Sequence, residues 1–255
     1  MISVGQNECL RNVAAQASAN EAWNEYAQYC RDREGGLRRR AFQHLEKFLE
    51  TAKAWSFDDR SAFANWVCLR ITEFGESDSC GLVPQPLAEQ LVVPTLREWA
   101  GSETTNSTPC RWLGMFFSGV IYPGLRASLT TGGDDAYSLL REALRRSPED
   151  RLARIRLIEM IVGAAEFSCH HLPHYYIGEP KNDLARIAEA IKLLSGLVEP
   201  AQNARLQSEV DHVSQLIDDW IRFTDAGESD FNQWCLTRGR TYRWIKAYYY
   251  SANGT

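Results

Sequence analysis

The chain has 255 residues, a formal net charge of −5 at pH 7, 44% hydrophobic residues and 24% charged residues. These values are typical of a globular protein with one large domain or two small ones, and they exclude disorder on the scale of a domain. The mildly acidic balance also excludes a generic nucleic-acid binder, whose surface would be basic throughout.

The hydrophobic pattern indicates helices along nearly the whole chain. Apolar residues recur every three to four positions, and the period-two alternation of half-buried strands is almost absent. Glycine and proline clusters separate the helical stretches, and the clearest breaks are the loop 76–86 and the linker-like stretch 101–109. In chain order, we expect a helix pair within 8–33 and then helices over 37–55, 57–74, 87–99 with a bend at Pro94, 110–120, 134–146, 149–167, 183–198, 204–224 and 231–250.

This element order predicts an all-α fold of stacked antiparallel helical hairpins in a single domain, 1–255. Two similar halves, about 37–100 and 134–200, form one version of this arrangement, because each contains two helices, a proline-containing loop and a third helix. The alternative explanation is chance similarity between amphipathic helices. A last helix within 229–250 would cap the stack.

One predicted hairpin, within 134–167, resembles a known repeat. Its first helix has an apolar stripe and a proline stop, formed by Ala136, Leu140, Ala143 and Pro148. This stretch resembles the second helix and terminal proline of a tetratricopeptide repeat. The chain departs from that family at Ile158, where the family has a small residue, and in the long loop 169–182. The resemblance implies an α-α superhelix that binds a peptide or protein, and it carries over no catalytic residue.

The sharpest local signal is the segment CHHLPHYYIGEP, residues 169–180, which holds three of the five histidines. His170, His174 and Glu166 would supply three ligands to a zinc-type divalent metal and leave a fourth position for water, as in a metal-dependent hydrolase. Pro173 prevents the histidines from lying on one helical face. The alternative is a structured loop whose histidines bond to the backbone and whose tyrosines fill a groove.

The C-terminal segment combines cations with aromatic residues. No acidic residue follows Asp230, and the aromatic side chains there are interleaved with Arg238, Arg240, Arg243 and Lys246. Cations and stacking faces together suit single-stranded nucleic acid. The alternative is a capping helix whose aromatic residues pack on the preceding helix and whose cations neutralise Asp218, Asp219 and Asp225. The acidic balance of the whole chain favours the capping helix, so a nucleic-acid partner is not expected.

Arginine is dense around the predicted hairpin, with Arg141, Arg145, Arg146, Arg151, Arg154 and Arg156. These side chains would line a groove for an acidic peptide or a carboxylate terminus. Alternatively, they form a solvated face that is paired with neighbouring Glu and Asp.

No P-loop, dinucleotide-binding fingerprint, nucleophile elbow or EF-hand loop occurs in the sequence. We therefore expect a non-enzymatic scaffold for protein–protein interaction, an adaptor or an inhibitor (immunity-type) protein with a protein or peptide partner. The alternatives are the metal-dependent hydrolase, which needs a zinc-type ion as its cofactor, and the nucleic-acid binder. The expected partner-binding residues are His171, His174, Tyr175, Tyr176, Arg151 and Arg154.

The cysteines and the N-terminus bear on location. The seven cysteines are scattered and never have CxxC spacing, which argues against a disulfide framework and indicates a reducing compartment. The first residues show no basic start followed by an apolar run, so we expect no signal peptide. The most apolar segment, 113–122, is far shorter than the roughly 20 residues that span a bilayer. We therefore expect a cytoplasmic protein with no membrane partner.

Overall fold

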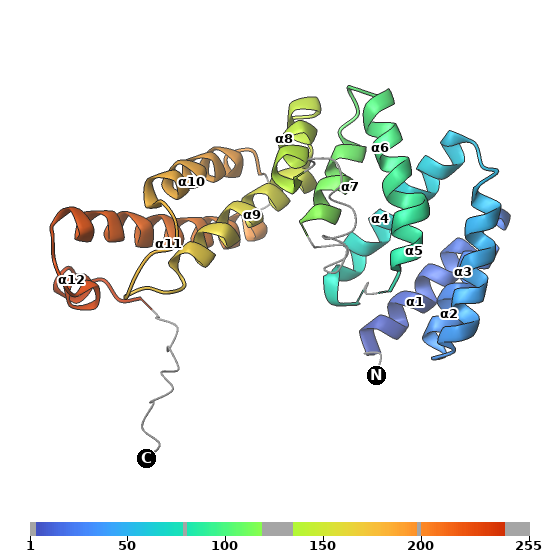
Figure 1. Ribbon diagram of the computed structural model, residues 1–255, viewed down its shortest axis with the longest axis horizontal. Coiled ribbons are helices and arrows are strands. Elements are labelled where there is room, and N and C mark those ends of the chain that lie inside the picture. The colour runs from blue at the N-terminus through green and yellow to red at the C-terminus, as the bar shows by residue number, and fades with distance from the viewer. Residues whose placement is uncertain (1–3, 79–80, 119–134, 198–199, 243–255) are drawn as a thin grey trace, which may run out of the picture. The chain divides into compact units, whose positions relative to one another are not determined.

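The computed structural model describes residues 4–78, 81–118, 135–197 and 200–242. These ranges are helical and contain no strand, so the prediction of an all-α fold is confirmed (Figure 1). No helix among them has both the length and the apolar character needed to cross a bilayer. The elements in chain order are α1 (Val4–Ala17), η1 (Glu21–Trp23), α2 (Asn24–Glu34), α3 (Arg38–Ala52), α4 (Phe57–Asp78), α5 (Gln85–Leu87), η2 (Ala88–Val92), α6 (Val93–Ser102), α7 (Thr108–Phe117), α8 (Ala136–Arg146), α9 (Arg151–Cys169), α10 (Pro180–Leu194), α11 (Pro200–Asp225) and α12 (Phe231–Thr237).

The chain divides into two compact units, Met1–Ala153 and Arg154–Thr255. The boundary falls in the first turn of α9. The first unit therefore contains α1 to α8, and the second contains most of α9 together with α10, α11 and α12. The two similar halves at 37–100 and 134–200 stay a prediction.

Aromatic side chains form the core of the first unit between α2, α3 and α4. Tyr26 of α2 lies with its ring centroid 5.5 Å from that of Phe48 and 5.2 Å from that of Phe63. All three rings are completely buried. The Tyr26 hydroxyl donates a hydrogen bond of 2.8 Å to the carbonyl oxygen of Leu82, so the one polar atom of the cluster is satisfied.

The stripe that resembles a tetratricopeptide repeat is buried against the preceding helix. Ala136, Leu140 and Ala143 face inward, and α8 packs on α7. Gly114 of α7 permits this contact, because a Cβ atom added there would lie 2.7 Å from Leu140 Cγ. A glycine inside a helix costs about 1 kcal/mol relative to alanine. The close approach of the two helices explains why this position has no side chain.

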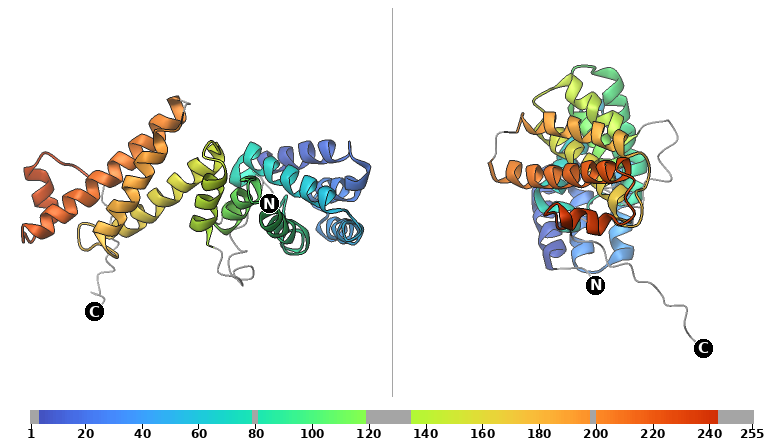
Figure 2. Two further views of the ribbon diagram at one scale, coloured as in Figure 1. Left: turned by 90° about the horizontal axis from the view of Figure 1, so that it is seen from above. Right: turned by 90° about the vertical axis from the view of Figure 1, so that its left-hand side faces the viewer.

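The second unit is built on α10 and α11, which lie side by side (Figure 2). The inward side of α11 carries a buried stripe formed by Leu206, Val210, Val213 and Ile217. At the end of α11 the ring of Phe231, from α12, lies 5.0 Å from Trp220 and 5.1 Å from Phe223 between centroids. These aromatic contacts fix α12 on α11.

Two helices differ from the prediction for local backbone reasons. The last helix ends at Thr237 instead of continuing to residue 250, because Gly239 adopts a φ of 67° and the Arg240 N–H bonds to the Cys235 carbonyl oxygen. The predicted positions 243–250 lie outside the described residues. The bend expected at Pro94 takes the form of a π-helical turn, η2, just before it. Pro94 has no N–H for the carbonyl four residues earlier, which disfavours a regular α-helix there.

Six of the seven cysteines lie in the described residues, and all six are buried thiols. Burial raises the pKa of Cys30 and Cys169 to about 12 and that of Cys235 to about 11. Only the thiolate reacts quickly, so we expect a Cys80→Ser variant to show no fast reaction with Ellman's reagent at pH 8. Six thiols should react after unfolding in urea. A fast-reacting thiol in the folded variant would show that one of these sites is open to solvent.

Candidate partner-binding site

The loop between α9 and α10 folds back on the end of α9. Its backbone makes successive turns, with the Leu172 N–H bonded to the Cys169 carbonyl oxygen at 2.9 Å and the His174 N–H bonded to that of His171 at 3.0 Å. The Ile177 N–H then returns to the Ser168 carbonyl oxygen at 2.9 Å. These bonds give the histidine-rich segment a defined shape on the surface of the second unit.

Three side chains, those of Leu172, Cys169 and Tyr176, hold this loop on the second unit. Leu172 is 2% exposed and Cys169 is also buried. The Tyr176 hydroxyl donates a hydrogen bond of 2.8 Å to Oδ2 of Asp183, a buried residue in the first turn of α10. Burial and this bond raise the pKa of Tyr176 well above its usual range. The Tyr176 hydroxyl is therefore engaged within the protein and helps to position the loop, and partner binding by its half-buried ring stays a prediction.

In the same segment, four rings form a continuous series that we call the aromatic–histidine stack. It consists of Phe167, at the end of α9, and of His170, His171 and Tyr175. The centroid distances are 4.9 Å between Phe167 and His170, 3.8 Å between His170 and His171, and 4.5 Å between His171 and Tyr175. The last pair is nearly parallel, with an interplanar angle of 24°.

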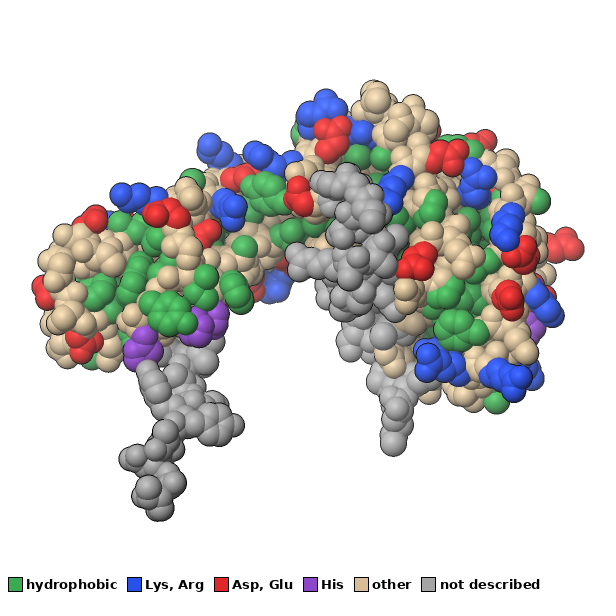
Figure 3. All heavy atoms as spheres, viewed as in Figure 1, with side chains coloured by type: hydrophobic (Ala, Val, Ile, Leu, Met, Phe, Trp, Pro, Cys, Tyr) green, Lys and Arg blue, Asp and Glu red, His purple; other side chains and the backbone are tan. Residues whose placement is uncertain are grey.

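The two ends of the stack are unusually open to solvent for aromatic residues. Phe167 is 64% exposed and Tyr175 is 51% exposed. His174 is also exposed, and His170 and His171 are half-buried. Histidine side chains are visible beside hydrophobic ones on the second unit (Figure 3). Large aromatic side chains exposed on an ordered loop are typical of a binding site.

The predicted metal ligands His170, His174 and Glu166 are not grouped around a common point. His170 Nδ1 lies 2.5 Å from the Phe167 carbonyl oxygen, so this nitrogen donates to the backbone. Glu166 and His174 are both exposed. Within the described ranges, no three His, Cys, Asp or Glu side chains are grouped so that they could hold a metal ion. The site therefore offers exposed rings and hydrogen-bonding imidazoles, with no metal-binding geometry around them.

The two arginines predicted to bind a partner, Arg151 and Arg154, lie at the start of α9, whereas the aromatic–histidine stack begins at its other end. Arg154 packs against the α10–α11 connection, because a Cβ atom added at Gly196 would fall 1.2 Å from Arg154 Nη1. Arg151 belongs to the first unit. Several neighbouring arginines make ion pairs within their own unit, such as Arg156 with Glu159 at 3.4 Å. These contacts favour the alternative of a paired, solvated arginine face.

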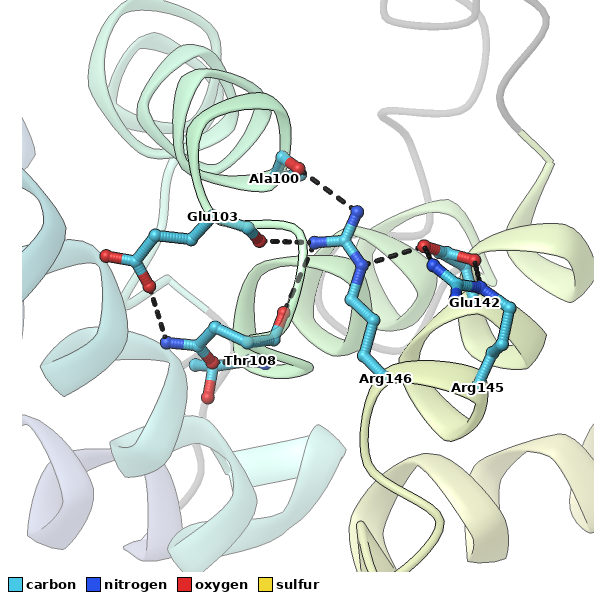
Figure 4. Close-up of polar contacts among 7 residues, drawn as sticks. Ala100, Glu103, Thr108, Glu142, Arg145 and Arg146 are labelled. Atoms are coloured by element: carbon cyan, nitrogen blue, oxygen red, sulfur yellow. Dashed lines mark hydrogen bonds and ion pairs between the residues drawn. The ribbon is translucent and has the colours of Figure 1, made fainter.

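Arg146 has a structural role in the first unit (Figure 4). Its side chain is 8% exposed, and its guanidinium donates to the carbonyl oxygens of Ala100 and Glu103, at the end of α6, and to that of Asn106. Its Nε donates to Glu142 at 2.8 Å, and Arg145 binds the same carboxylate. Hydrogen bonds from Arg145 and Arg146 lower the pKa of Glu142 to about 2. Arg146 thus joins α8 to the end of α6 and presents no free cation to a peptide.

The described part of the basic aromatic segment also makes internal contacts. Trp234 is 5% exposed, and the Arg238 guanidinium lies 4.0 Å from the centroid of its ring. Asp219 of α11, a buried carboxylate, accepts a hydrogen bond from Tyr242 and pairs with Arg240 at 3.4 Å. These contacts favour the capping alternative over a nucleic-acid surface. Arg243 and Lys246 lie outside the described residues.

The chain matches no protein-family model, no curated protein sequence and no solved structure. Any functional assignment therefore depends on the residues of the site itself.

Proposed function

We propose that this protein binds another protein or peptide through the aromatic–histidine stack, and that it acts as an adaptor or as an inhibitor that neutralises its partner. The exposure of Phe167 and Tyr175 at the two ends of one ordered series of rings carries the proposal. Exposed aromatic side chains dominate the energy of many protein interfaces when a partner covers them.

The local structure is also suited to binding because it is ordered before the partner arrives. The backbone turns, Leu172 and the Tyr176–Asp183 hydrogen bond hold the loop in place. Ordering a mobile side chain on association costs about 0.5–1.5 kcal/mol, and rings held by stacking avoid much of this cost. The half-buried imidazoles add hydrogen-bonding groups that can select the partner.

Two further features complete the proposal. The architecture would be a stack of tetratricopeptide-like helical hairpins, which the packing of α1 on α2, α2 on α3 and α7 on α8 supports. The location would be the cytoplasm, which suits the buried thiols of the six described cysteines.

Affinity capture from the source lysate, with and without nuclease, tests the function. The proposal predicts a stoichiometric protein that persists after nuclease treatment and that is lost from a Phe167→Ser/Tyr175→Ser bait. An Ile191→Ser bait is the matched control, because Ile191 is another exposed apolar side chain of the same unit, on α10. Equal recovery on all three baits, or recovery that depends on nucleic acid, would contradict the proposal.

We expect the affinity for this captured partner to fall at least threefold between pH 7.5 and pH 5.5. Partial burial and the neighbouring His170 and His174 lower the pKa of His171 below its ordinary value of 6.5. The folded loop therefore favours neutral His171, and it loses stability as the pH falls below 6.5, where the unfolded chain binds the proton more readily. A partner that covers the ring lowers this pKa further, so protonation opposes binding.

Titration calorimetry at the two pH values measures the effect, with His171→Gln as the control that should show a smaller pH dependence. An affinity that is unchanged or higher at pH 5.5 would show that the imidazole does not lie in the interface.

A further inference from the structure

A second surface, on the first unit, has the form of a groove. Two hollows of about 280 Å³ and 340 Å³ share Leu49 and Gln90 and so continue into each other. One wall is α3 and the other is the run α5–η2–α6. Along both walls the residue numbers rise in the same direction, from Phe42 and Pro86 at one end to Lys53 and Glu98 at the other.

The floor of the groove is apolar and well packed. Leu45, Leu49 and Leu91 are each at least 93% buried yet line the hollows. Pro86 and Pro94 add apolar surface on the opposite wall. Figure 3 shows hydrophobic side chains at the surface of this face, over the region of α3 and α5. Each hollow lies near the lower limit of the roughly 300–1,000 Å³ that is usual for the site of a compact organic ligand, and the two follow each other along the wall.

The walls favour a helix over an extended chain as the occupant. An extended peptide binds best at a strand edge, where unpaired N–H and C=O groups meet its backbone. Helical walls offer few such groups, because their backbone bonds are made internally. Between Phe42 and Lys53 the wall rises about 16 Å, at 1.5 Å per residue, which matches three turns of a helix. Side-chain ridges of a third helix would fit between the two walls.

The charges of the groove set the direction of that helix. Two carboxylates, Glu46 and Glu50, line the end near Pro86, where no cation of the described residues lines the hollow. Lys53 and Arg60 line the other end together with Glu98, and Arg60 pairs with Glu98 at 2.9 Å. Glu50 pairs with Lys53 at 2.5 Å, but Glu46 makes no ion pair within the described part of the chain. A helix has a positive N-terminus and a negative C-terminus, so it is best accommodated with its first turn beside Glu46.

We propose that this groove docks one amphipathic helix of a partner protein, with its apolar stripe over Phe42, Pro86 and Pro94, the apolar lining residues that keep exposed surface, and with a Lys or Arg of its first turn beside Glu46. The helix runs in the same direction as α3. This surface belongs to the first unit and is independent of the aromatic–histidine stack of the second.

Selection from a displayed library of amphipathic helices, with Lys or Arg allowed in either the first or the last turn, tests the proposal on the full chain. We expect the enriched helices to carry the cation in the first turn. A Gln90→Trp variant should weaken their binding at least tenfold, because Gln90 is exposed and lines both hollows. Glu46→Lys should weaken it at least tenfold as well.

Lys47→Trp is the matched control for the added tryptophan, because Lys47 is exposed on α3, next to Glu46, but lines neither of the two hollows. Circular dichroism of each variant shows whether it is folded. No enrichment, equal binding to the wild type and the Gln90→Trp variant, or no preference for a first-turn cation would overturn the proposal. The Phe167→Ser/Tyr175→Ser variant should bind the selected helices as the wild type does. This variant therefore separates the test of helix docking in the groove from the test of partner binding by the aromatic–histidine stack.

Discussion

Replacing Asp150 by alanine is expected to lower the free energy of unfolding of the first unit by about 4 kcal/mol. The Asp150 carboxylate is almost fully buried and accepts hydrogen bonds from Ser107 Oγ at 2.7 Å, Arg111 Nη1 at 2.9 Å and the Ala153 N–H at 3.1 Å. The substitution removes the cap of α9. It also leaves Arg111, whose side chain is 14% exposed and whose guanidinium packs on the Trp112 ring, without its carboxylate partner. Breaking a buried ion pair by removing one partner costs about 3–5 kcal/mol.

The matched control is Asp135→Ala, which removes the cap of α8 at an exposed position. Asp135 accepts from the Ser138 N–H at 3.0 Å and has no buried cation beside it in the described structure, so a loss of about 1 kcal/mol is expected. Urea unfolding followed by tryptophan fluorescence measures both variants, because five of the eight tryptophans lie in the first unit. An effect of Asp150→Ala no larger than that of Asp135→Ala would show that the buried network contributes little.

The double substitution Phe167→Ser/Tyr175→Ser is expected to weaken binding of the partner about 100-fold, which corresponds to about 3 kcal/mol. Each side chain is more than half exposed, so removing it leaves the core of the second unit intact. The loss should therefore appear in the affinity, measured by calorimetry, and not in the urea midpoint. The single Ile191→Ser control, at a side chain that is 45% exposed, should change the affinity less than threefold.

A lower urea midpoint for the double variant would indicate a structural role for the two rings. An affinity that changes no more than in the Ile191→Ser control would place the partner elsewhere on the chain.

Helical periodicity predicted most of the fold because nearly every helix buries one apolar stripe. The stripe of α8, for example, is buried where the sequence indicates. Periodicity does not say which helix a stripe contacts, so it did not identify Gly114 as the residue on which Leu140 packs. It also extended the last helix too far, because the interleaved aromatic residues after Gly239 continue a helical pattern. The positive φ of Gly239 ends the helix, and a lone glycine is a weaker signal than the stripe.

The candidate site was predicted in part. The histidine density of 169–180 indicated the segment in which we place the candidate site, and its role in binding stays a prediction. In the structure His174 and Tyr175 are exposed and His171 is half-buried. Residue types alone did not distinguish the exposed Tyr175 from Tyr176, because only the fold brings Asp183 to the Tyr176 hydroxyl. Phe167 was missed as a site residue. Its position off the buried face of α9, directly before the histidines, is the sequence signal that would have found it.

The measurement that tests the central claim most directly is the rate at which diethyl pyrocarbonate modifies each histidine, with and without the captured partner. The aromatic–histidine stack lies in the interface if our account is correct, so His171 and His174 should react at least tenfold more slowly in the complex. His212, exposed on α11, should react at the same rate in both states. Unchanged reactivity of His171 and His174 in a saturated complex would contradict the account.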